Sequence, residues 1–210
     1  SPDTNITESW NGSAWTEVND LNTPRGNSMT GLGLSNSNAL SAGGTGPSGP
    51  SQRLVNAESW NGSSWTEVND LNTARNSGGS SGSSTSGLVF GGMTPPYTGK
   101  TESWDGTSWT EVNDLNTSRY SACVGIGVNN TDAMCVGGFG STYDDEVETW
   151  DGSSWTEVND LNTAKYGLGA SVAGSTSTAI VFGGQKSSSP TITDTETWNG
   201  TSWTEQNNLA

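Results

Sequence analysis

The chain has 210 residues, of which only 29% are hydrophobic, and its 7 basic and 22 acidic residues give a net charge of −15. This excess of negative charge argues against the binding of nucleic acid or of an anionic membrane surface. No apolar run approaches the roughly 20 residues that a membrane-spanning helix requires, so we expect no membrane insertion.

Low hydrophobicity combined with high charge is typical of disordered chains, but the tryptophans of this sequence are regularly placed. A pair of tryptophans five residues apart occurs five times, at intervals of 44–50 residues. Intervals of this length are typical of propeller or solenoid repeats. We therefore predict a folded repeat protein whose structural core contains Trp10, Trp15, Trp60, Trp65, Trp104, Trp109, Trp150, Trp155, Trp198 and Trp203.

Each tryptophan pair belongs to a predicted outer β-hairpin, with a Gly-containing turn between the two tryptophans. We expect these outer hairpins at residues 6–21, 56–71, 100–115, 146–161 and 194–209. Runs of small and β-branched residues predict inner hairpins at residues 25–45, 76–94, 119–140 and 166–185. One inner and one outer hairpin together make the four-stranded antiparallel blade of a β-propeller.

The outer hairpins outnumber the inner ones by five to four. We therefore predict a single all-β domain over residues 1–210, a five-bladed propeller with an incomplete N-terminal blade. A four-bladed ring with a spare hairpin is the alternative. Because an unpaired strand edge invites pairing, we expect the absent strands to come from a longer precursor or, through self-association, from a neighbouring molecule.

The repeat resembles the kelch repeat, which carries a basic residue before its first strand, a Gly-Gly pair after its second and a Trp in its fourth. The basic residues here are Arg25, Arg75, Arg119 and Lys165, and the pairs are Gly43-Gly44, Gly91-Gly92, Gly137-Gly138 and Gly183-Gly184. The phrase Glu-Ser-Trp-Asn-Gly is also similar to kelch-like tracts in structural proteins of marine bacteriophages. The Asp-box of sialidase-type propellers is a rival, but the segment from Ser103 to Trp109 is one residue too short for it.

Several kinds of chemistry are missing from the sequence. It contains no histidine, which excludes Ser-His-Asp and Cys-His catalysis and imidazole metal sites. We expect no catalytic residues, no enzymatic activity and no cofactor. Acidic residues such as Glu111 and Asp114 recur in each unit; they fit a strand-ending turn, and a Ca²⁺ site is the weaker interpretation.

Two further features bear on function. Cys123 and Cys135 lie on consecutive predicted strands at equal distances from Asn129, which makes them candidates for a cross-strand disulfide or for two buried thiols. The variable inserts between second and third strands fall on one rim and include Tyr97, Phe139 and Tyr143, our candidate binding residues.

Two interpretations of function follow. The first is a non-enzymatic structural or adhesive propeller, extracellular or on a virion surface, that recognises a protein or glycan surface through the rim loops. The alternative is a multivalent lectin with one carbohydrate site in each blade.

Overall fold

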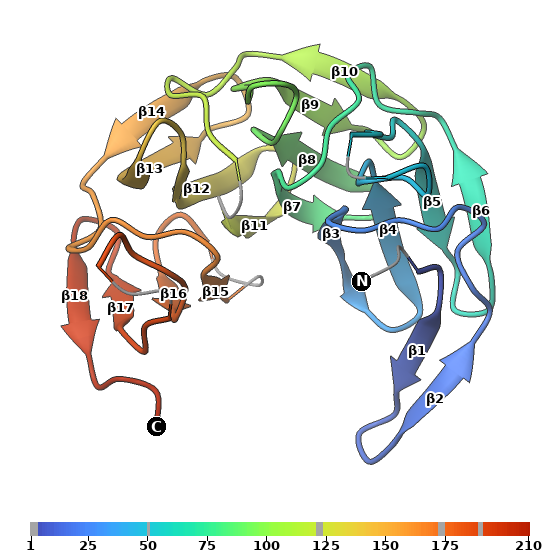
Figure 1. Cartoon of the computed structure of the whole chain (residues 1–210), viewed down its shortest axis with the longest axis horizontal. Helices are drawn as coiled ribbons and strands as arrows, with labels where there is room; N and C mark the ends of the chain where they lie inside the picture. Colours follow the sequence, from blue (N-terminus) through green and yellow to red (C-terminus); the bar gives the residue numbers. More distant parts are fainter. Residues whose placement is uncertain (1–3, 50, 121–123, 172–174, 189–190) are drawn as a thin grey trace.

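The computed structural model of the chain describes residues 4–49, 51–120, 124–171, 175–188 and 191–210. Its strands form one two-stranded sheet and four four-stranded sheets, all antiparallel. The sheets lie side by side along an open arc, with β1–β2 near one end and β15–β18 at the other (Figure 1). The described residues include no helix long and apolar enough to cross a membrane.

We call the two-stranded sheet the half-blade; it consists of β1 (Thr7–Trp10) and β2 (Trp15–Val18). The first full blade contains β3 (Met29–Ser35), β4 (Asn38–Ala42), β5 (Ala57–Trp60) and β6 (Trp65–Val68). The second contains β7 (Gly79–Ser83), β8 (Ser86–Phe90), β9 (Thr101–Trp104) and β10 (Trp109–Val112). The third contains β11 (Val124–Asn129), β12 (Asp132–Phe139), β13 (Tyr143–Trp150) and β14 (Trp155–Val158). The fourth contains β15 (Gly169–Ala170), β16 (Ala179–Phe182), β17 (Thr195–Trp198) and β18 (Trp203–Gln206).

These sheets confirm the predicted fold class, an all-β propeller with five blade positions and an incomplete N-terminal blade. In every full blade the strands pair in chain order. The missing part of the N-terminal position is its inner hairpin, since β1 pairs with β2 alone among the described strands.

The turn between each tryptophan pair has a local cause. Asp105 Oδ1 accepts hydrogen bonds from the backbone N–H groups of Thr107 and Ser108, both at 2.8 Å. Gly106 adopts a φ of +94°, a conformation that favours glycine. The turn places Trp104 directly opposite Trp109, with ring centroids 5.1 Å apart. The corresponding ring separations in the other four hairpins are 5.3–5.5 Å.

The hydrophobic core lies between the blades. One buried cluster occupies each of the three interfaces between full blades; the cluster between the second and third, for example, joins Leu88 and Phe90 to Trp150 and Trp155. The prediction that all ten tryptophans are core does not hold for Trp10 and Trp15, which are 43% and 64% exposed. Among the described residues, no inner strands and no preceding blade cover them.

A buried ion pair fixes the linker that enters each full blade. In the second blade, Arg75 Nη2 lies 2.6 Å from Glu102 Oε1, and both side chains are fully buried. The same carboxylate accepts hydrogen bonds from the backbone N–H groups of Asn72 at 2.7 Å and Thr73 at 3.1 Å. Burial lowers the pKa of the Arg75 guanidinium, and the charge of Glu102 opposes that effect.

We call this arrangement the glutamate latch. One glutamate on the third strand of the blade binds both the basic residue and the preceding Asn-Thr segment. These contacts compensate the buried carboxylate charge, which would otherwise be costly to remove from water. The pairs in the four blades are Arg25–Glu58 at 2.6 Å, Arg75–Glu102 at 2.6 Å, Arg119–Glu148 at 3.1 Å and Lys165–Glu196 at 2.7 Å.

We expect Arg75→Met to lower the free energy of unfolding by about 3–5 kcal/mol, because Glu102 would remain buried without its cation. Urea denaturation followed by tryptophan fluorescence measures this change. The control is Lys100→Met, which removes an exposed pair with Glu111 at 3.1 Å and should cost less than about 1 kcal/mol. Equal losses in the two variants would contradict the importance of the latch.

The fourth-strand tryptophans offer a second test. Trp155 Nε1 donates a hydrogen bond to Thr101 Oγ1 of the preceding blade at 3.0 Å. Trp203 is the equivalent tryptophan of the fourth blade, and there Val147 takes the position of Thr101. The buried Trp203 Nε1 therefore has no hydrogen-bond partner among the described residues. We expect Thr101→Val to destabilise the chain by about 1–3 kcal/mol and Val147→Thr to stabilise it by about 1 kcal/mol. Thermal and urea unfolding of the two nearly isosteric variants check the opposite signs; changes of the same sign would contradict this account.

Candidate functional site

In each full blade, one rim carries a pair of residues whose backbones are joined by the same antiparallel bridge. In the third blade, Tyr120 and Phe139 exchange two backbone hydrogen bonds, each 2.9 Å long. Tyr120 follows the latch residue Arg119, and Phe139 follows the Gly-Gly pair. The equivalent bridges in the other blades join Gly26 to Thr45, Asn76 to Met93 and Tyr166 to Gln185. The backbone is therefore repeated while the side chains differ, so the rim can vary its chemistry on a rigid base.

The chain's four tyrosines gather on this rim with one phenylalanine. The ring of Phe139 lies 5.6 Å from that of Tyr120, 5.4 Å from that of Tyr143 and 5.7 Å from that of Tyr166. Tyr143 and Tyr166 are 5.3 Å apart, and Tyr97 stacks on Tyr120 at 6.2 Å. We call these five side chains the rim aromatic cluster. All are half-buried, so each is held by its neighbours and still presents part of its surface to solvent.

The structure brings the three predicted binding residues into this one cluster. Phe139 and Tyr143 are in direct contact, and Tyr97 joins them through Tyr120. Tyr120 and Tyr166 were not among the predicted binding residues, because they lie outside the inserts between second and third strands. The sequence does mark these two tyrosines. Each directly follows a repeated basic residue, at a position where the first two full blades have Gly and Asn.

Acidic residues adjoin the cluster. Arg119 Nη1 lies 2.9 Å from Glu146 Oε2 and 3.6 Å from Asp144 Oδ2. Burial raises the pKa of the Asp144 carboxyl, although a hydrogen bond from the Glu146 N–H and the charge of Arg119 oppose it. The pKa of Asp160 is also raised, first by burial and then by the charges of Asp145 and Glu146. This part of the rim therefore combines aromatic surface with carboxylates that bind protons more tightly than usual.

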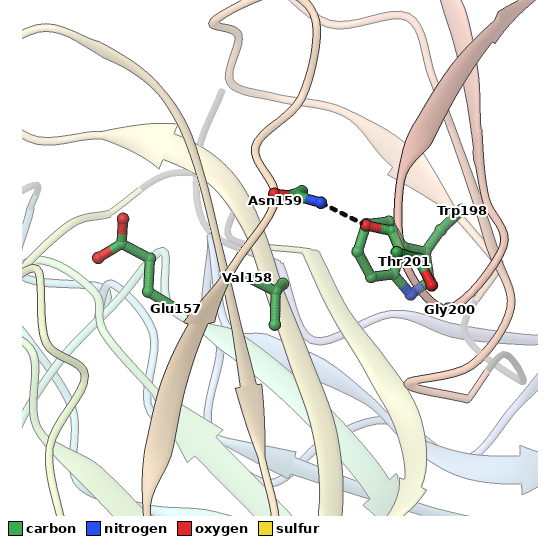
Figure 2. Close-up of a pocket in the computed structure, with 6 residues that line it drawn as sticks. All are labelled: Glu157, Val158, Asn159, Trp198, Gly200 and Thr201. Atoms are coloured by element: carbon green, nitrogen blue, oxygen red, sulfur yellow. Dashed lines mark hydrogen bonds between the residues drawn. The ribbon is translucent and has the colours of Figure 1, made fainter.

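A second candidate is a groove between the outer strands of neighbouring blades. Glu157, Val158 and Asn159 line one side of it, and the β17–β18 hairpin forms the other, as Figure 2 shows. Its volume is about 430 Å³. Asn159 Nδ2 donates a hydrogen bond across it to the backbone oxygen of Thr201 at 2.7 Å. The indole of Trp198 borders the groove but is only 4% exposed, which limits stacking of a ligand on its face.

The cross-groove hydrogen bond recurs along the chain. At each junction an Asn that follows the fourth strand donates to a carbonyl in the outer turn of the next blade. These bonds are Asn19 to Ser63 at 2.7 Å, Asn69 to Thr107 at 2.8 Å, Asn113 to Ser153 at 2.7 Å and Asn159 to Thr201 at 2.7 Å.

The predicted cysteine pair and the recurring acidic residues were the other candidate sites. The disulfide candidate Cys123 lies outside the described residues. Cys135 is buried opposite Gly125, and its Sγ accepts a hydrogen bond from Arg119 Nε at 3.3 Å. Within the described ranges, no group of three or more acidic or cysteine side chains is placed to hold a metal ion. Asp114, one of the recurring acids, accepts a hydrogen bond from the backbone N–H of Thr101 at 3.3 Å.

Comparison with known proteins identifies the architecture. No protein-family model and no curated protein matches the sequence. Many solved structures do match, among them that of YjhT, with a TM-score of 0.77 over 97% of this chain and 76% of YjhT. The two sequences are 12% identical, so this likeness shows the fold alone.

Two aspartates should have pKa values on opposite sides of the usual value of about 3.9: that of Asp144, on the rim, above it, and that of Asp151, away from the rim, below it. Burial raises the pKa of Asp144, whereas backbone N–H groups of Ser154 and Ser153 lower that of the exposed Asp151. Asp151 should thus add stability above the ordinary pKa and lose it as the pH falls through its lowered value. The ionised Asp144 should lower the stability of the folded state at neutral pH, and this loss should disappear as the pH falls and the carboxyl is protonated. Carbon-detected NMR titration measures both midpoints; a midpoint for Asp144 below that of Asp151 would refute the assignment.

Proposed function

We propose that this protein is a non-enzymatic, kelch-like propeller of a virion or cell surface that recognises a protein or glycan through the rim aromatic cluster. The main support for this proposal is that five aromatic side chains from separate loops and strand ends meet on one rim. They are Tyr97, Tyr120, Phe139, Tyr143 and Tyr166. The kelch-like assignment is supported by the recurring latch residues and glycine pairs.

Aromatic side chains suit this role for physical reasons. Tyrosine offers a large, rigid apolar face and a hydroxyl group, so it can stack on a sugar ring or anchor a protein interface at a low entropic cost. The Tyr166 hydroxyl already donates a hydrogen bond of 2.6 Å to Gln185 Oε1, which fixes the orientation of its ring. A preorganised cluster of this kind is typical of the few side chains that dominate binding energy at an interface.

The chemistry of the rim supports recognition without catalysis. The chain has no histidine, and the rim carboxylates Asp144 and Glu146 pair with Arg119. In this proposal the protein uses no cofactor, binds no nucleic acid, does not insert into membranes and acts outside the cell or on the virion.

A multivalent lectin is the second candidate, and the recurrence of the hydrogen bond that crosses the groove favours it. The same Asn-to-carbonyl hydrogen bond is present at four junctions, each beside a glutamate on the fourth strand and a tryptophan on the third. A sugar bound in these grooves would occupy several equivalent sites in one chain.

A glycan array followed by calorimetry on the glycans it retains tests these proposals. We expect the double variant Tyr143→Ala with Tyr166→Ala to weaken binding at least about tenfold, since interface anchors contribute this much. Asn159→Ala, in the outer groove, is the matched control and should leave rim binding unchanged. Circular dichroism verifies that each variant is folded.

Stoichiometry distinguishes the two candidates. One bound ligand for each chain, lost in the tyrosine variant, supports the rim. Several ligands for each chain, retained in the tyrosine variant, would overturn the rim proposal in favour of the lectin. Hydrolysis of any glycan by the purified chain would contradict the non-enzymatic role.

A further inference from the structure

The third blade departs from the repeat directly beside the rim aromatic cluster. Residues 144–146 read Asp-Asp-Glu, and we call them the acidic run. The equivalent segments of the other full blades are 54–56 (Leu-Val-Asn), 98–100 (Thr-Gly-Lys) and 192–194 (Ile-Thr-Asp). All four segments have the same backbone contact, because the middle carbonyl accepts a hydrogen bond from a leucine that follows the fourth strand. These bonds are Leu71 to Val55, Leu115 to Gly99, Leu161 to Asp145 and Leu209 to Thr193, at 2.9–3.0 Å. The acidic run is therefore a property of one blade and not of the fold.

The glutamate latch does not require these acids. In the second blade, Arg75 pairs with Glu102 and directs its Nη1 group to the backbone carbonyls of Gly91 and Lys100. Lys100, at the position of the third acid, pairs through its own side chain with Glu111. A blade with neutral and basic residues at these positions is thus complete, and the acidic run calls for another explanation.

The acidic run gives this part of the rim more carboxylates than cations. Arg119 is shared by three of them, because its Nη1 group faces Asp144 and Glu146 while its Nη2 group lies 3.1 Å from the latch glutamate Glu148. Asp145 forms no ion pair with a described residue. Burial raises the pKa of the Asp144 carboxyl, so its ionised form is less stable there than in water. A further cation at this rim would offset that cost.

The acidic run also adjoins two tyrosines of the cluster. Asp144 directly follows Tyr143, and its carbonyl accepts a hydrogen bond of 3.0 Å from the N–H of Lys165, the residue before Tyr166. The rings of Tyr143 and Tyr166 are themselves 5.3 Å apart. Aromatic faces attract cations, and arginine is the cation most often found on them. Its planar guanidinium can stack on a ring and still direct N–H groups to a carboxylate.

We propose that the rim aromatic cluster binds an arginine side chain of a partner protein, whose guanidinium stacks on the tyrosine rings and pairs with the acidic run. This inference rests on the proposed function and narrows it to a protein ligand. A neutral sugar would leave the carboxylates uncompensated, and an acidic sugar would be repelled by them and by the net charge of −15. A partner segment that carries arginine has the complementary charge, which also speeds its association.

Two peptides that differ in one charge test the proposal on the full chain. The probe is acetyl-Ser-Arg-Ser-amide, and the control is the same peptide with citrulline, which is uncharged and nearly isosteric with arginine. In an NMR titration the arginine peptide should give saturable shifts at the amides of Tyr120, Phe139, Tyr143 and Tyr166. The citrulline peptide should bind at least about fivefold more weakly, because it keeps the planar group but lacks the charge.

Exchanging the acidic run for the segment of the second blade makes the test specific. The substitutions are Asp144→Thr, Asp145→Gly and Glu146→Lys, which the repeat itself shows to be compatible with a blade. We expect at least about a tenfold loss of arginine binding, because the carboxylates that pair with the guanidinium are gone. The urea midpoint should stay the same or rise, whereas a purely structural role of the acids would lower it. The control, Glu17→Lys with Glu67→Lys, changes the net charge equally at exposed strand residues of other blades and should keep the binding.

Three results would overturn the proposal. They are equal binding of the two peptides, no saturable shift with the arginine peptide, and an equal loss of binding in the exchange variant and its charge control. If the glycan array nevertheless finds a ligand that is lost in the Tyr143→Ala and Tyr166→Ala double variant, the proposed function stands and only the choice of arginine fails. Arginine binding that this double variant retains would place the ligand outside the cluster and contradict both.

Discussion

The structure depends on the buried pairing of a basic side chain with a third-strand glutamate in each full blade. The glutamate binds the cation and the backbone of the linker that arrives from the preceding hairpin, so one carboxylate fixes both the blade and its connection. An ionic contact of this kind is costly to break because its members lie out of water. In a chain with few aliphatic residues, it defines the position of each linker while the tryptophans fill the space between blades.

The latch also explains how one rim can vary. The carbonyls of Arg75, Arg119 and Lys165 each accept a hydrogen bond from the second glycine of the preceding blade, at 2.9 Å for Arg119 and Gly92. The first glycine must lack a side chain, since a Cβ on Gly91 would come within 2.7 Å of the same carbonyl. The next residue along each segment then forms the rim bridge. Side chains such as Tyr120 and Phe139 thus project from a backbone that the latch and glycines hold in place.

Much of the fold could be predicted from the sequence because it repeats. The spacing of the tryptophan pairs and glycine pairs gave the blades, the antiparallel hairpins and the incomplete N-terminal position. The exposure of Trp10 and Trp15 was not anticipated, because identical local sequence does not report whether a neighbouring blade covers it. The rim site was predicted only in part, because Tyr120 and Tyr166 belong to linkers and not to the inserts. The backbone bridge to Phe139 brings Tyr120 into the cluster, and ring contacts with Phe139 and Tyr143 of the neighbouring blade bring Tyr166 into it.

The central claim is that the latch sets the blade while the rim pair is free to serve recognition. It is tested most directly by transplanting the rim pair of the second blade into the third, with Tyr120→Asn and Phe139→Met, and measuring the free energy of unfolding by urea denaturation. The account predicts a loss well below the roughly 3–5 kcal/mol expected for removing a latch cation. A loss as large as that of the latch variant would show that the aromatic cluster is a structural core, and would contradict the account.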